Sequence, residues 1–261
     1  MPKPTIGLSM LYCMAEPFSK MVKRLASVKT PYVEIVDEGL QALSKKRVAT
    51  LKEIAESKGL KYTVHAPFAD INIASPSKTI LNAALRRLEE SIIWANSLDA
   101  RLWVFHPGSQ TGISMFYPGK EWTQNSESIQ SLHKTADEYG VNIAFENLPQ
   151  KYGFIMKSPE DFVKFYKETK LNDIGIVLDV GHANLEGHTE AFLRKLPDKI
   201  VEIHVSDNNG DNDQHLGLGY GKIDWIQFAQ ILKDIAYDKT LIIESVERVQ
   251  ESVQKLKQML A

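Results

Sequence analysis

Short apolar runs rich in β-branched residues recur along the chain, separated by longer stretches with the periodicity of amphipathic helices. Eight runs have the character of buried strands, at residues 5–10, 32–36, 61–66, 102–107, 142–147, 174–180, 200–206 and 240–245. Eight helical stretches alternate with them, at residues 18–28, 43–59, 77–98, 128–140, 158–168, 189–196, 225–235 and 249–260. Ser158 before Pro159 and two acidic residues is a helix N-cap signal that supports one of these boundaries.

Strict alternation of strand and helix indicates parallel strands joined by right-handed crossovers, and eight such units close into a barrel. We therefore expect an α/β fold, a single (β/α)₈ TIM barrel with eight parallel strands. An open, doubly wound sheet is the structural alternative. No linker or low-complexity segment divides the sequence, so residues 1–261 are expected to form one barrel domain.

Composition and charge exclude some classes of protein. No stretch approaches the roughly 18 uninterrupted apolar residues of a membrane span, so no membrane partner is expected. The formal net charge is -2 and basic residues do not cluster, which neither indicates nor excludes a nucleic-acid partner. The absence of a secretory leader and the single cysteine, Cys13, favour a cytoplasmic protein in which Cys13 is a small buried group. The oligomeric state is not indicated.

Histidines and carboxylates close most of the predicted strands. In a (β/α)₈ barrel the active site forms at the C-terminal ends of the strands, so these side chains should meet at one mouth. Alternation along the fourth strand directs Leu102, Val104 and His106 inward, and Trp103 and Phe105 toward the helices. The residues at or just beyond the strand ends are His65, His106, Glu146, Asp179, His182, His204, Asp213, His215 and Glu244.

Taken singly, each of these residues is more often a capped or hydrogen-bonded group than a metal ligand, but together they are harder to dismiss. They include five of the seven histidines; His133 lies in a helical segment and His188 in a turn, where surface side chains are expected. Imidazole and carboxylate ligands suit Zn²⁺ or Mn²⁺, and one ion needs only about four to six ligands. We therefore predict two or three divalent ions.

The segments around these residues resemble a known family. The similarity lies in VHAPF, FHPGS, FENLP, VLDVGHAN, EIHVSD, DQHLGLGYGKIDW and IIES. They look like the serial motifs of the xylose isomerase-like superfamily of barrels, which includes sugar isomerases, sugar epimerases and endonuclease IV. The resemblance covers nearly the whole chain. It is specific for the superfamily and much less specific for the reaction.

Three groups of metal ligands are implied by this resemblance. The site shared by the epimerases and the nuclease corresponds to Glu146, Asp179, His204 and Glu244. In the nuclease pattern, a second ion is bound by His65, His106 and Glu146. A third is bound by His182, Asp213 and His215. Because every one of these positions is filled, the resemblance favours a polynuclear site.

Two reactions and one non-catalytic role are open. In a sugar or sugar-phosphate isomerase or epimerase, one ion would bind a carbonyl and a neighbouring hydroxyl oxygen. Glu146 and Glu244 would then transfer the proton, or else serve only as ligands. In an endonuclease IV-like phosphodiesterase, three ions would neutralise the phosphate, generate hydroxide and stabilise the leaving alkoxide. A non-catalytic metal-binding barrel is the third alternative.

Several departures from endonuclease IV favour the isomerase or epimerase. Val180 and Gly181 replace its hydroxyl and thiol residues, and the loop after the seventh strand is short and lacks its NDxK run. Asp37 and Glu38 stand where the nuclease inserts a basic DNA-probing loop, and acids there would repel phosphates. YVEIVDEG and HLGLGYGKIDW are instead similar to sugar phosphate isomerases or epimerases. The expected partner is a small sugar or sugar phosphate, and DNA only in the nuclease alternative.

Weaker candidates for substrate binding are Glu34, Phe68, Trp122 and Lys222. The segment 108–122 is long for a βα connection and contains Phe116 and Tyr117, so it is either a lid over the mouth or a packed surface loop. Lys120 and Lys151, like Lys222, are candidates to meet a substrate phosphate, although a solvated lysine is the commoner role.

Overall fold

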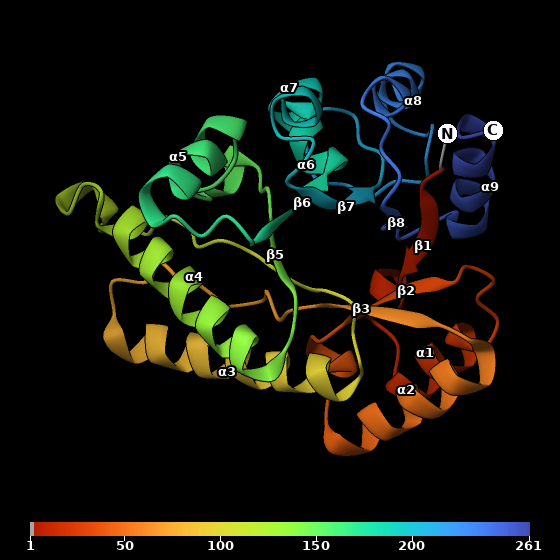
Figure 1. The fold of residues 1–261 in the computed structure, drawn as a ribbon, viewed down its shortest axis with the longest axis horizontal. Helices are drawn as coiled ribbons and strands as arrows, with labels where there is room; N and C mark the ends of the chain where they lie inside the picture. The colour runs from red at the N-terminus through yellow and green to blue at the C-terminus, as the bar shows by residue number, and fades with distance from the viewer. Residues whose placement is uncertain (1–2) are drawn as a thin grey trace.

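The computed structural model describes residues 3–261, whose eight parallel strands form a closed barrel in the order β1 to β8 (Figure 1). The strands are β1 (Thr5–Ser9), β2 (Tyr32–Val36), β3 (Lys61–His65), β4 (Trp103–Phe105), β5 (Ile143–Glu146), β6 (Gly175–Asp179), β7 (Ile200–Val205) and β8 (Thr240–Ile243). Pairing of β1 with both β2 and β8 closes the barrel. The predicted (β/α)₈ barrel is confirmed, and the open sheet is wrong.

Helices cover the outside of the barrel, with α3 beside α4 (Figure 1). The α-helices are α1 (Phe18–Leu25), α2 (Lys45–Lys58), α3 (Lys78–Ser97), α4 (Lys120–Tyr139), α5 (Pro159–Thr169), α6 (Val180–Leu185), α7 (Thr189–Lys195), α8 (Trp225–Asp234) and α9 (Val249–Met259). Short 3₁₀ turns lie at Met10–Cys13, Gly39–Gln41, Ser114–Phe116 and Gln150–Tyr152. No helix among residues 3–261 is long and apolar enough to cross a bilayer.

Two helical features differ from the sequence prediction. Helix α4 begins at Lys120, whereas the sequence predicted a start at residue 128. The first turns were missed because the residues they bury, such as Asn125 and Ser126, are polar and show no apolar periodicity. Helix α6 was not predicted. It follows β6 without a loop, and the Asp179 side chain caps it by accepting a hydrogen bond from the His182 N–H.

The core has two layers, as the alternation along β4 predicts. Leu102 and Val104 belong to a small apolar cluster inside the barrel. Trp103 and Phe105 instead pack in the layer between strands and helices, where burial of each such ring stabilises the fold by about 1.5–3 kcal/mol. Cys13 is fully buried as expected, and burial raises its thiol pKa to about 11.

Candidate metal centre

A pocket of about 210 Å³ opens at the C-terminal ends of the strands. One part of its lining is polar: His65, His106, Glu146, His182, Asp213, His215 and Glu244. The rest is apolar or aromatic: Leu11, Phe68, Leu148, Pro149, Tyr152 and Phe154. Within residues 3–261, neither lysine nor arginine lines it. A cavity of similar size beside α8 and α9 has no histidine, aspartate or glutamate side chain in its lining, so the pocket over the strand ends is the candidate site.

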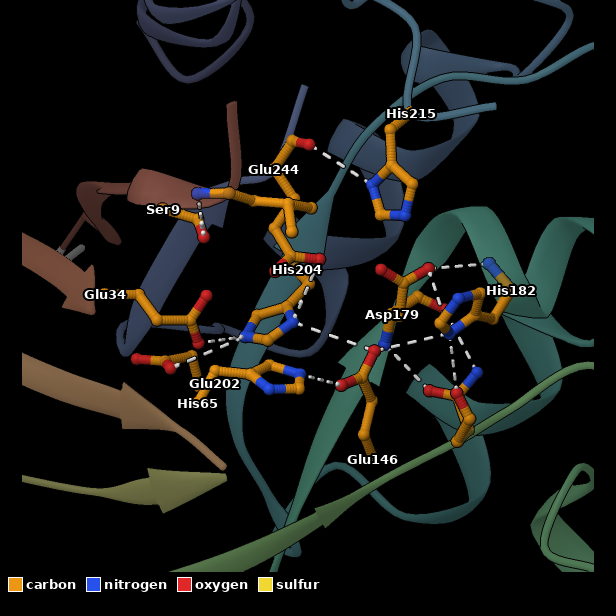
Figure 2. A network of polar contacts seen from close by, with 12 residues as sticks. Ser9, Glu34, His65, Glu146, Asp179, His182, Glu202, His204, His215 and Glu244 are labelled. Carbon is orange, nitrogen blue, oxygen red and sulfur yellow. Dashed lines mark hydrogen bonds and ion pairs between the residues drawn. The ribbon is translucent and has the colours of Figure 1, made fainter. Parts of the chain in front are cut away.

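Four buried residues at the floor of the pocket form what we call the inner group: Glu146, Asp179, His204 and Glu244. One ligand atom from each lies within 4.8 Å of the others. His204 Nδ1 is 3.2 Å from Glu244 Oε2 and 3.8 Å from Glu146 Oε1. Both glutamates face the same ring nitrogen and reach it from different directions (Figure 2). This arrangement surrounds one position with three carboxylates and one imidazole.

The first outer group consists of His65, His106 and Glu146, so it shares Glu146 with the inner group. The Nε2 atoms of both histidines lie 3.3 Å from Glu146 Oε2. His65 Nδ1 lies 2.8 Å from the Ala66 carbonyl oxygen, which can only accept. Nδ1 therefore carries a proton in every protonation state of the ring, and Nε2 is the nitrogen that faces Glu146, where it can hold a second proton or bind an ion.

The second outer group consists of His182, Asp213 and His215. Both histidine Nε2 atoms lie 3.2 Å from Asp213 Oδ2. Their Nδ1 atoms donate to backbone carbonyls, that of His182 to Asn147 at 2.9 Å and that of His215 to Glu244 at 3.2 Å. As in His65, the backbone thus fixes a tautomer whose free nitrogen faces a carboxylate.

The loop that carries Asp213 and His215 is organised by Asp207, which is fully buried. Its carboxylate accepts hydrogen bonds from the Gly219 N–H at 2.6 Å and from the Trp225 indole N–H at 2.8 Å. A Cβ atom at Gly221 would lie 2.3 Å from Asp207 Oδ1, so only glycine fits there. This role of Asp207 was missed by the sequence reasoning, since its partners lie 12 and 18 residues away.

The donor set fits a divalent cation. Asp179 Oδ2, His204 Nδ1 and Asp213 Oδ1 are buried and lack a hydrogen-bond partner within the described part of the chain. Each such atom costs about 1–3 kcal/mol if it stays unsatisfied. Carboxylate oxygens and imidazole nitrogens without thiolates are ligands of Zn²⁺ and Mn²⁺, and coordination would satisfy these atoms.

Burial and the close spacing of charged side chains shift the pKa values of residues in all three groups. Burial lowers the pKa of His65, but the neighbouring carboxylates outweigh burial and raise it to about 9. Asp213 has the same effect on His215, whose pKa is also about 9. Burial raises the pKa of Glu244 to about 7 although His204 opposes the shift. The ion-free site therefore holds protons that a divalent cation would displace.

Of the four weaker candidates, Phe68 alone lines the pocket, edge-on to His65 with ring centroids 5.5 Å apart. Trp122 lies against α5, where its indole N–H donates to Glu168 at 2.7 Å. Lys222 is exposed outside the pocket. Glu34 is fully buried beneath His204 and does not line the pocket.

The other residues named for the lid or for a phosphate also lie outside the lining. Phe116 and Tyr117 are exposed in the loop before α4. Lys120 stacks over the Tyr117 ring at 5.5 Å, and the Lys151 ammonium donates to the Asp211 carbonyl at 2.9 Å. His133 pairs with Asp173 on the outer surface at 2.9 Å, away from the pocket.

The structure corrects the expectation that Asp37 and Glu38 both carry a free negative charge. Asp37 is fully buried and receives two hydrogen bonds from the Arg87 guanidinium, at 2.7 and 3.0 Å. Glu38 accepts the backbone N–H groups of Phe68 and Ala69 at 3.0 and 2.9 Å, which fixes the turn that carries Phe68. Arg87 neutralises the charge of Asp37, so of the two acids expected to repel phosphates only Glu38, which keeps its charge while it orders this turn, remains.

Two buried polar residues near the site were missed by the sequence reasoning. Asn147 joins the ends of β5 and β6, since its side chain accepts from the Asp179 N–H at 2.7 Å and donates to the Asp179 carbonyl at 3.1 Å. Glu202 lies inside the barrel and pairs with Arg101. Alternation along β7 places Glu202 on the same face as His204, and that signal was available in the sequence.

Comparison with known proteins agrees with this fold. A family model described as "Xylose isomerase-like TIM barrel" matches residues 22–260. A D-tagatose 3-epimerase-like protein of known structure superposes with a TM-score of 0.91 at 31% identity, covering 98% of this chain and 97% of that chain.

Among curated relatives, a protein of Methanocaldococcus jannaschii is 31% identical over 92% of this chain and 83% of its own length. A D-psicose 3-epimerase of Ruminiclostridium cellulolyticum is 24% identical over 87% of this chain and 78% of that enzyme. A probable endonuclease 4 of Aquifex aeolicus is 25% identical, but over only 66% of this chain and 65% of that protein.

Proposed function

The chain belongs to the xylose isomerase-like TIM barrel family, and within it we propose a divalent-metal-dependent sugar isomerase or epimerase. The observation that carries this proposal is the convergence of Glu146 and Glu244 on Nδ1 of His204 in the inner group, at the floor of a pocket of sugar size. Similarity to sugar 3-epimerases over most of the chain supports it.

In this mechanism the two glutamates do the proton transfer. A Zn²⁺ or Mn²⁺ ion held by the inner group would polarise a carbonyl oxygen and the hydroxyl oxygen beside it. One glutamate removes the proton from the carbon next to the carbonyl, and the other returns a proton to the opposite face of that carbon. The configuration of one carbon is thereby inverted. Burial of both carboxylates keeps competing water away from the transferred proton.

The pocket chemistry favours a free sugar over a sugar phosphate. Phosphate recognition ordinarily uses arginine or lysine donors, and neither lines the pocket in the described chain. Phe68, Tyr152 and Phe154 offer an apolar wall for the C–H face of a sugar, opposite the polar ligands for its oxygens. We therefore propose an uncharged ketose as the substrate class.

The test is solvent exchange. The protein loaded with Mn²⁺ or Zn²⁺ is incubated in D₂O with a panel of free ketoses and their phosphates. We expect deuterium to enter the carbon beside the carbonyl of a free ketose, and a chelator to stop the exchange. The exposed Glu53 on α2 provides a matched control, since Glu53→Gln should leave exchange unchanged. Absence of metal-dependent exchange with every sugar would reject the proposal.

A phosphodiesterase is the second candidate, because both outer groups are assembled around the pocket. Three ions would suit phosphate neutralisation, hydroxide formation and leaving-group stabilisation. Its test is nicking of duplex DNA at abasic sites that chelation abolishes. With a net charge of -2 and no basic side chain in the pocket, we expect neither nicking nor salt-dependent DNA binding.

A further inference from the structure

A second layer of buried charge lies beneath the inner group. Glu34 of β2 and Glu202 of β7 are fully buried in the barrel interior, below the His204 ring (Figure 2). His204 Nε2 is 3.2 Å from Glu34 Oε2 and 3.7 Å from Glu202 Oε1. The other ring nitrogen, Nδ1, faces Glu244 and Glu146. His204 therefore connects the inner group to two carboxylates that no substrate in the pocket can reach.

The two lower carboxylates are not equivalent. Glu202 is neutralised by Arg101, which lies just before the start of β4. Glu34 has no such partner: within residues 3–261 its single ion pair is with His204, and neither of its oxygens has a partner in hydrogen-bond geometry. Its register neighbours on β1 and β3 are Ser9 and Thr63, which carry no charge. The position of Glu34 is thus explained by the imidazole alone.

His204 also differs from the histidines of the outer groups. In His65, His182 and His215 a backbone carbonyl holds Nδ1–H, and Nε2 faces the carboxylates. In His204 the orientation is reversed, so that Nδ1 faces the inner group and Nε2 points down into the barrel. Within the described chain, Nε2 has no partner in hydrogen-bond geometry, and the nearer of its two carboxylate neighbours is Glu34 Oε2 at 3.2 Å. A side-chain acceptor inside the barrel has to take the place of the carbonyl.

We propose that Glu34 is a positioning residue for the metal centre, whose carboxylate accepts the Nε2 proton of His204 and so fixes the tautomer that leaves Nδ1 free to bind an ion. Metal-ligating imidazoles commonly donate their other N–H to a carboxylate in this way. The inference rests on the proposed metal dependence. It assigns Glu34 no contact with substrate, in contrast to the sequence-based expectation.

The test compares three variants of the full chain. Glu34→Met has similar volume but no acceptor, Glu34→Gln keeps an acceptor oxygen, and Glu202→Gln removes the other carboxylate at the same depth. Burial lowers the pKa of His204, but the neighbouring carboxylates outweigh burial and raise it well above its usual value. Nitrogen-15 NMR of the ion-free protein is therefore recorded at a pH at which the ring shifts show that the second proton has been lost, and there it reports the His204 tautomer. Titration with Mn²⁺ alone reports affinity and stoichiometry. We expect Glu34→Met to lose the Nε2–H tautomer and to bind Mn²⁺ about 10–100-fold more weakly. Glu34→Gln and Glu202→Gln should keep the tautomer and most of the affinity.

Three results would overturn the role of Glu34. The first is a wild-type tautomer and affinity in Glu34→Met, and the second is an equal effect of Glu202→Gln. The third is the loss of one whole bound ion in Glu34→Met, which would make Glu34, Glu202 and His204 a cation site of their own. If Glu34→Met does not fold, Glu34→Gln decides, because loss of the tautomer despite a retained acceptor contradicts the proposal. A wild type that binds no Mn²⁺ rejects the proposed function, while the NMR result still decides on Glu34.

Discussion

The inner group and the second outer group differ in depth and in what holds them. The side chain of Glu244, the most exposed of the inner group, is 5% accessible, whereas those of His215 and Asp213 are 19% and 20% accessible. The inner residues lie at strand ends, as do His65 and His106 of the first outer group at or directly after β3 and β4, while Asp213 and His215 lie on the loop after β7. The barrel itself therefore builds the inner and first outer groups, and the loop after β7 contributes two of the three ligands of the second outer group. This division explains how one barrel supports several chemistries.

The largest effect is expected at Glu146, because it belongs to both the inner and the first outer group. Glu146→Gln keeps an oxygen donor and nearly the same volume but loses the base, so activity should fall by about 10²-fold or more. Glu244→Gln should behave alike, and label exchange with solvent should stop in both variants. His215→Ala, confined to the second outer group, should cost less. An equal loss in His215→Ala would show that the outer ions take part in the chemistry.

Ion content tests the comparison directly. We expect two or three Zn²⁺ or Mn²⁺ ions per chain, with the ion of the inner group the last to leave during stepwise chelation because its ligands are the most buried. Elemental analysis and anomalous diffraction provide the counts and positions. A single ion that touches neither His65 nor His215 would eliminate the polynuclear site and strengthen the epimerase proposal.

The pH dependence should differ between ion-free and ion-loaded protein. The pKa values of His65 and His215 are raised from 6.5 to about 9, so the stability they contribute is fully present below pH 6.5 and is lost as the pH rises through 9. The Tm of the ion-free protein should therefore decrease as the pH rises from 6.5 to 9, while the Tm of the ion-loaded protein should not show this decrease. Calorimetric titration near pH 7.5 in two buffers should reveal that protons are released when the ion binds. If no protons are released, the raised pKa values of His65 and His215 are contradicted.

The smallest effect is expected at the rim of the pocket. Phe68→Ala removes an aromatic wall beside His65 and His106 and should raise KM more than it lowers kcat. Trp122→Phe serves as the control, since Trp122 contacts α5 rather than the pocket. Equal kinetic effects of the two substitutions would mean that the first turn of α4 reaches the substrate.

Local pattern and motif order were sufficient to predict the barrel and to single out seven residues at or just beyond the strand ends, together with Asp213 and His215 on the loop after β7. Alternation along a strand determines which of its side chains face the interior. Local patterns do not indicate which polar residues far apart in the sequence contact one another. Arg87 neutralises Asp37 from 50 residues away, and nothing near either residue indicates the pair. The role of Glu34 likewise depends on a ring that comes from β7. The predicted start of helix α4 was eight residues too late because the buried residues Asn125 and Ser126 are polar and do not contribute to an apolar pattern.

The Asp207 anchor has a consequence for how such an enzyme could diversify. Asp207 and Leu216 exchange two backbone hydrogen bonds, so the intervening residues leave and rejoin the body of the protein at a single clamped point. Extra residues near the exposed tip at Asn209–Asn212 would lengthen a loop already closed at its base, and each doubling of its length costs only about 0.6 kcal/mol. New segments could thus be grafted over the pocket without rebuilding the barrel, and substrate preference could evolve separately from the inner group beneath it.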